Sequence, residues 1–184
     1  MNAIEKYELL RPCISDGDLI LFRGTRLIAK IIQFSDESYF NHIGIVFKRH
    51  GALFIVDANG NGVQADRLSY RIKKYKNGDF LIIKPKVSKV LQELEMQNLL
   101  MRSDSKTIKY DFKNGIIELI NRVFNFDFRI KQNDSRDICS DFVSRYAINL
   151  EIMYSEFNDL QIPLPQDYLR YVNLNKVEII GGRK

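Results

Sequence analysis

A histidine that opens an apolar run and a cysteine that precedes a helical pattern are the residues of this chain whose types and spacing could do chemistry. His42 lies in residues 41–47 (NHIGIVF), which alternate as a strand does, and Cys139 lies in residues 137–143 (DICSDFV). A thiolate attacks a carbonyl carbon while an imidazole carries the proton. These two groups are therefore what a cysteine hydrolase needs, provided that the fold brings them together.

The alternation also proposes a partner for His42. Residues 52–57 (ALFIVD) form the next apolar run, and residues 48–51 (KRHG) between the runs predict a four-residue hairpin loop. If Phe47 pairs with Ala52, His42 lies directly opposite Asp57, with Cβ atoms about 4.5–5.5 Å apart. The carboxylate would then accept one ring N–H and leave the other nitrogen to face a thiol. Asn59 is the alternative, because a neutral acceptor can also orient an imidazole.

Cys139 is expected in the first turn of a helix. Ser135 or Asp137 could cap this helix, and the positive end of its macrodipole favours the thiolate. Asp137 and Asp141 oppose that effect, so the spacing does not fix the thiol pKa. The rival nucleophile is Cys13, which precedes His42 in the chain but has no apolar helix after it.

The order of these segments resembles a known family, the circularly permuted branch of the NlpC-type papain-like hydrolases, and within it the YiiX-like group. That resemblance implies Cys139 as nucleophile, His42 as base and Asp57 in the third position, where relatives often carry Glu. It spans roughly residues 14 to 170. The motifs that carry it are GDLILF (17–22), HIGIVF (42–47), FIVDANGNGV (54–63), YDF (110–112), CSDFVSRY (139–146) and PLPQDYLRY (163–171).

The elements predicted around these residues indicate an α+β fold, with a small, mostly antiparallel sheet packed against helices, in a single domain over residues 1–184. The resemblance implies that this fold is permuted papain-like. Strands are expected at 18–22, 42–47, 52–57, 63–65 and 80–84, with an edge strand at 176–180. Helices are expected at 4–11, from Thr25 to about 32, and at 88–102, 116–124, 139 onward and 166–172.

Composition limits the class of protein and the kinds of site that the chain can hold. The chain has 184 residues with 45% hydrophobic content, enough for one sizeable core. No export signal or membrane-length apolar run is recognisable, so a cytoplasmic protein with its two cysteines reduced is the expectation. A metal site would require Cys13, His42, His50 and Cys139 to converge without any metal-binding spacing, so no metal and no cofactor are predicted.

The formal net charge of +5 permits an acidic partner. Basic residues gather in 71–76 (RIKKYK) and at Lys84, Lys86 and Lys89, and this cluster is interpreted as a solvated face of strand and loop rather than a surface for anionic lipid or nucleic acid. No nucleic-acid motif accompanies it. The expected partner is a small peptide, amino-acid-derived or lipid acyl substrate of a hydrolase or acyltransferase. The alternative is an inactive module that binds a peptide, amino acid or lipid headgroup.

Overall fold

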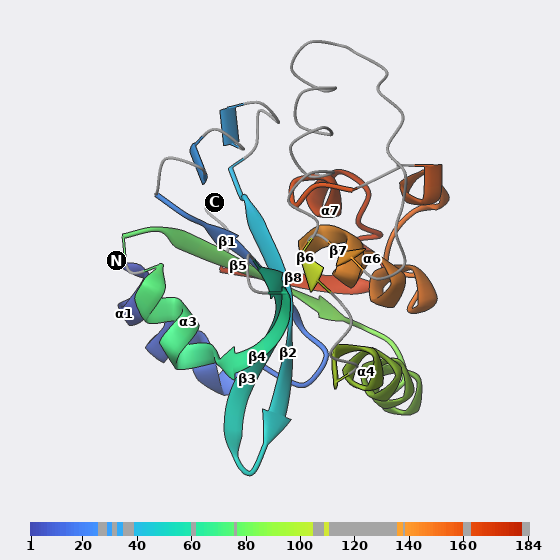
Figure 1. Cartoon of the computed structure of the whole chain (residues 1–184), viewed down its shortest axis with the longest axis horizontal. Coiled ribbons are helices and arrows are strands. Elements are labelled where there is room, and N and C mark those ends of the chain that lie inside the picture. Colours follow the sequence, from blue (N-terminus) through green and yellow to red (C-terminus); the bar gives the residue numbers. More distant parts are fainter. Residues whose placement is uncertain are drawn as a thin grey trace.

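The fold is built on one six-stranded antiparallel sheet, in the strand order β4-β3-β2-β1-β5-β8 (Figure 1). The computed structural model describes residues 1–25, 29–30, 33–34, 39–59, 62–75, 77–104, 109–110, 136–137, 139–159 and 163–181. The predicted α+β class and antiparallel sheet are confirmed. The sheet strands are β1 (Leu19–Arg23), β2 (His42–Arg49), β3 (Ala52–Asn59), β4 (Gly62–Arg67), β5 (Asp79–Pro85) and β8 (Val177–Ile180). A separate short parallel pair joins β6 (Lys109–Tyr110) to β7 (Arg136–Asp137).

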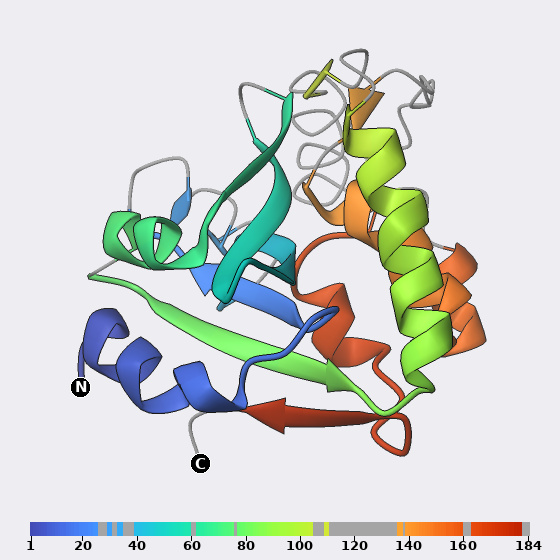
Figure 2. The same cartoon turned by 90° about the horizontal axis from the view of Figure 1, so that it is seen from below.

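Helices cover both faces of this sheet (Figures 1 and 2). One face carries α1 (Ala3–Leu10) and α3 (Leu68–Lys74), and the other carries α4 (Lys89–Asp104), α6 (Cys139–Asn149) and α7 (Asp167–Arg170). Short 3-10 turns follow α1 at Arg11–Cys13 and α6 at Ser155–Asp159. None of the described helices is long and apolar enough to cross a bilayer.

Two hydrophobic cores follow from strand alternation. Ile20, Phe22 and Val46 point toward α1 and α3, where they meet Tyr7, Leu68 and Ile72. The intervening residues Leu19, Leu21, Ile43 and Ile45 point the other way and pack with Phe142, Val143 and Tyr146 of α6. Because β1 and the start of β2 are apolar on both faces, a charged side chain there must find a partner inside the protein.

The hairpin between β2 and β3 differs from the prediction. Phe47 pairs with Phe54 and Arg49 with Ala52, so the loop has two residues, His50 and Gly51, rather than four. Both loop residues have positive φ, 49° and 75°, which is the conformation of a tight hairpin turn whose twist matches the strands. The predicted pairing of Phe47 with Ala52 was therefore wrong by two residues.

Some of the other predicted elements are confirmed and others are not. The first helix, the strands around residues 63–65 and 80–84, the helix from Lys89 and the edge strand β8 are confirmed within a few residues. The predicted helix 116–124 and most of the one after Thr25 lie outside the described residues. Residues 68–74 form a helix where a strand or loop was expected, because Leu68 and Ile72 are spaced to bury one helical face.

Candidate functional site

His42 and Asp57 form a buried pair at one end of β2. The His42 ring nitrogen Nε2 lies 2.8 Å from Asp57 Oδ2. Asp57 is fully buried and His42 is 9% exposed. This distance suits a hydrogen bond from Nε2–H to the carboxylate, and in that tautomer Nδ1 is the nitrogen that carries the lone pair.

The contact forms even though the predicted register was wrong. Backbone pairing of β2 with β3 ends at Ile45 opposite Val56, and continuing that register would set Gly44, rather than His42, opposite Asp57. A shift of two residues preserves the face on which every side chain lies, because the side-chain period of a strand is two. His42 and Asp57 therefore share a face, and their side chains meet diagonally.

Arg71 completes the polar cluster from α3. Its Nη2 lies 2.8 Å from Asp57 Oδ1 and 2.9 Å from Asp66 Oδ2. Arg71 is 6% exposed, so its interpretation as part of a solvated basic face was wrong. Each carboxylate oxygen of Asp57 thus faces its own nitrogen partner, the imidazole on one side and the guanidinium on the other.

Aromatic rings surround the imidazole. The rings of His42 and Tyr75 are nearly parallel, 12° apart with centroids 6.4 Å apart. Phe22, paired with His42 across β1 and β2, has its ring centroid 6.2 Å from the imidazole and stacks on Tyr75 at 4.7 Å. These rings restrict the orientation of the imidazole and limit its contact with water.

Cys139 is the first residue of α6, as predicted. Its side chain lies outside the part of the protein that the structure describes. The inward residues of α6, Phe142, Val143 and Tyr146, pack on the face of the sheet that carries Ile43 and Ile45. His42 points to the opposite face, so the structure joins His42 to Asp57 and leaves the approach of Cys139 as a prediction.

The other sequence candidates lie apart from this cluster. Cys13 is exposed in the turn after α1. Its carbonyl oxygen accepts a hydrogen bond from Lys84 Nζ at 2.5 Å. His50 is exposed in the hairpin turn, as expected. The Asn59 side chain lies outside the described residues.

Arg71 was missed as a site residue, although its spacing from Leu68 and Ile72 places it on the inward face of α3.

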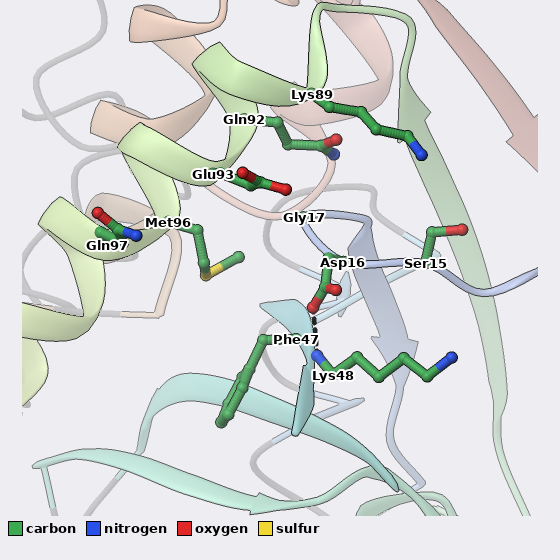
Figure 3. A pocket seen from close by; sticks show the side chains of 10 residues that line it. All are labelled: Ser15, Asp16, Gly17, Phe47, Lys48, Lys89, Gln92, Glu93, Met96 and Gln97. Atoms are coloured by element: carbon green, nitrogen blue, oxygen red, sulfur yellow. Dashed lines mark hydrogen bonds between the residues drawn. The ribbon is translucent and has the colours of Figure 1, made fainter. Parts of the chain in front are cut away.

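A cleft lies beside Phe47 and Lys48, toward the end of β2, whereas His42 is the first residue of that strand (Figure 3). It has a volume of about 370 Å³. Gln92 and Glu93 of α4 reach across it toward Asp16 and Gly17, and Phe47 lies on its far side. Its remaining lining residues are Ser15, Lys48, Lys89, Met96 and Gln97. The cleft is spatially separate from the His42 cluster.

Among the described residues, no group of three or more His, Cys, Asp or Glu side chains is arranged to hold a metal ion. Around His42, both carboxylate oxygens of Asp57 are already engaged by nitrogen donors, one of them a guanidinium. A cation would have to displace that guanidinium and share the site with its charge. The described cluster therefore does not fit a metal centre.

Comparison with solved structures shows similarity at the level of the fold. The chain is similar to the crystal structure of the metalloprotein yiiX from Escherichia coli O157:H7, with a TM-score of 0.62 and 19% sequence identity, over 92% of this chain and 97% of that chain. At this identity the similarity shows a shared fold alone. No family model matches the sequence. No curated protein matches it either.

Proposed function

We propose that this protein is a thiol-dependent hydrolase or acyltransferase of the permuted papain-like, NlpC-type class, with Cys139 as nucleophile, His42 as base and Asp57 as the residue that orients the imidazole. The observation that carries the proposal is the buried contact of 2.8 Å between His42 Nε2 and Asp57 Oδ2. The fold shared with yiiX and the position of Cys139 at the first residue of α6 support it.

The chemistry follows from these roles. His42 Nδ1 takes the proton of the Cys139 thiol, and the sulfur attacks the substrate carbonyl to form a tetrahedral oxyanion. A backbone N–H in the first turn of α6 can donate to that oxyanion. The bond to the leaving group then breaks, the leaving group takes the proton from His42, and an acyl-thioester remains on Cys139. Water, or an acceptor nucleophile in acyl transfer, then attacks the thioester carbonyl while His42 takes its proton. The carbon–sulfur bond breaks, the acyl product leaves, and the proton on His42 returns to the Cys139 sulfur.

This proposal makes a specific structural demand. The buried residues of α6 lie on one face of the sheet and His42 points to the other. Cys139 and His42 are the first residues of their elements, α6 and β2. The thiol must therefore reach the imidazole around the starting end of β2.

The word metalloprotein describes yiiX, and a metal role does not transfer to the described cluster. His42 Nε2 faces Asp57 and Arg71 holds the other carboxylate oxygen, so this cluster offers no set of three ligands. The mechanism above uses only side chains and backbone of this chain.

The substrate proposed is a small peptide, an amino-acid derivative or a lipid acyl compound. A net charge of +5 favours a substrate with an anionic group near the reacting carbonyl. Acidic acyl and peptidyl probes should therefore react at Cys139 faster than cationic probes of the same length. Selective reaction with cationic or long neutral acyl probes would contradict the charge argument and leave the thiol chemistry intact.

The experiment that tests the activity uses Cys139→Ala and Cys139→Ser beside a Cys13→Ser control. Mass spectrometry after exposure to a panel of acyl and peptidyl electrophiles should show an adduct on Cys139 in the wild type and in Cys13→Ser. A substrate identified from that panel should be turned over by those two proteins and by neither Cys139 variant. Turnover retained in both folded Cys139 variants would refute the assignment.

The cleft beside α4 favours a second candidate, a binding module without turnover. Its volume of about 370 Å³ suits a small ligand, and its lining combines Phe47 and Met96 with charged side chains of both signs. A peptide or amino acid that binds there should lose affinity in Met96→Ala and keep it in His42→Ala. Turnover that depends on Cys139 and His42 would show that ligand binding without catalysis is not the protein's main function.

A further inference from the structure

Arg71 approaches Asp57 on the side away from His42. Its Nη2 lies 2.8 Å from Asp57 Oδ1, while the imidazole lies 2.8 Å from Oδ2. The carboxylate is thereby fixed between two nitrogen donors that come from different elements, α3 and β2. Rotation of the carboxylate away from His42 would break the contact with Arg71.

Burying Arg71 in this position lowers the stability of the folded protein, and an ion pair with a purely structural role could avoid that loss. The Arg71 Nε atom is buried with no hydrogen-bond partner among the described residues. A buried donor without an acceptor destabilises the folded protein. Apolar side chains often replace buried ion pairs without loss of stability. An arginine in this position is therefore better explained by the electrostatic effect of its guanidinium on the Asp57 carboxylate.

Three charged residues of the described part of the chain form the ion-pair cluster beside the imidazole. Asp57 of β3 contacts it directly, Arg71 of α3 compensates Asp57, and Asp66 of β4 contacts Arg71 with 30% of its side chain exposed. Tyr75, which directly follows α3, contributes a ring beside the imidazole. Because Asp66 is partly exposed and water screens its charge, the Arg71 guanidinium compensates mainly the fully buried Asp57 carboxylate, which lessens the need for a protonated His42 beside it.

We propose that Arg71 is a positioning residue that fixes the Asp57 carboxylate and compensates its charge, so that His42 rests as the neutral imidazole with its proton on Nε2. In that form Nδ1 carries a lone pair and can accept a proton from a thiol. The catalytic consequence rests on the proposed hydrolase function. The state of the imidazole itself does not, and it is measurable without any substrate.

Nuclear magnetic resonance of the imidazoles tests this directly, because the chain has only two histidines. The ring nitrogen shifts of His42 in the wild type should show the neutral Nε2–H tautomer at neutral pH, with the exposed His50 as reference in the same spectrum. An imidazolium at His42 under these conditions, or the Nδ1–H tautomer, would overturn the proposal without any variant.

Three variants then isolate the charge of Arg71. Arg71→Met should raise the His42 pKa by about one unit or more, because the carboxylate loses its compensating cation. Arg71→Lys should restore the wild-type titration. Asp66→Asn, which removes the other ion pair of Arg71, should leave the His42 pKa unchanged or lower it.

A merely structural Arg71 would give a different result. Folded Arg71→Met, checked by circular dichroism, would then titrate at His42 as the wild type does, and that outcome would overturn the proposal. If Arg71→Met does not fold, Arg71→Gln replaces it, since its amide can still donate to Asp57 without a charge. Failure of the hydrolase assignment would appear in the Cys139 variants and would leave these His42 titrations interpretable.

Discussion

Two buried carboxylates, Asp57 and Asp18, show how the same group serves different purposes at two ends of one sheet. Asp57 is fully buried and Asp18 is 2% exposed. Asp18 Oδ2 accepts from the backbone N–H of Ser15 at 2.8 Å and from Lys84 Nζ at 2.9 Å. Asp57 accepts from two side chains, and one of these is an imidazole that can gain or lose a proton.

The partners of Asp18 explain its role. Lys84 Nζ also donates to the carbonyl of Cys13 and to Ser15 Oγ, so it ties the segment before β1 to β5. Burial raises the pKa of Asp18 to about 6, although Ser15 N–H and Lys84 act to lower it. Asp18 thus organises backbone around a turn, whereas Asp57 organises the position and charge of a titratable ring.

The largest expected effect is on catalytic activity, which should depend on Asp57 and not on Asp18. Asp57→Asn should lower kcat by about 10²–10⁴-fold, because an amide in place of the carboxylate no longer fixes the tautomer or stabilises the imidazolium. Asp18→Asn should leave kcat within about threefold, since its contacts lie outside the proposed proton path. Steady-state kinetics on a substrate of the wild type measures both, and equal losses would show that the two carboxylates do not differ in function.

The next effect concerns stability. Asp57→Ala removes the carboxylate that pairs with buried Arg71 and should lower the free energy of unfolding by about 3–5 kcal/mol. The double variant Asp57→Ala with Arg71→Met should recover part of that loss, because no unpaired charge remains buried. Urea denaturation followed by circular dichroism gives both values. A double variant no more stable than Asp57→Ala would show that the ion pair is not the source of the loss.

A pH dependence should single out Asp18. Its pKa in the folded protein is about 6, above its ordinary value of 3.8, so the folded state binds the proton more tightly than the unfolded state. Protonated Asp18 contributes its full stabilisation of the folded state below about pH 4. This contribution, at most about 3 kcal/mol, is lost as pH rises through about 6. In Asp18→Asn this slope should be absent from the unfolding free energy. An unchanged slope would assign the effect to other groups.

The smallest expected effect lies beside Asp18. The Tyr146 hydroxyl is buried in α6 and donates to the carbonyl of Gly17 at 2.9 Å. Tyr146→Phe removes this bond and should cost about 1 kcal/mol of unfolding free energy. Thiol reactivity and the His42 titration should not change, because the bond lies at the far end of β2. A change in either would show coupling between the two ends of the sheet.

Alternation along the strands could predict much of this arrangement. The period of two placed His42 and Asp57 on one face, and that conclusion survived a register error of two residues because parity was preserved. The error arose because His50 adopts positive φ, which the residue type does not announce. A register error of one residue would have separated the pair.

Charge clustering predicted less well. A run of basic residues suggested one solvated face, yet helical periodicity turns Arg71 inward beside Leu68 and Ile72 while Lys73 and Lys74 remain exposed. Its ion pair with Asp57 joins two different elements across 14 positions of sequence, so no local pattern identifies it. The proposed approach of Cys139 to His42 likewise depends on packing between segments almost a hundred residues apart.

Alkylation of the two cysteines tests the central claim most directly. The chain has two cysteines, and exposed Cys13 serves as the internal reference for Cys139. The proposal predicts that a neutral alkylating reagent labels Cys139 first at neutral pH, and that His42→Ala slows this labelling by about tenfold or more while the Cys13 rate stays constant. Peptide mass spectrometry resolves the two sites. Slow labelling of Cys139 in the wild type, at a rate that His42→Ala does not change, would contradict a catalytic thiol paired with His42.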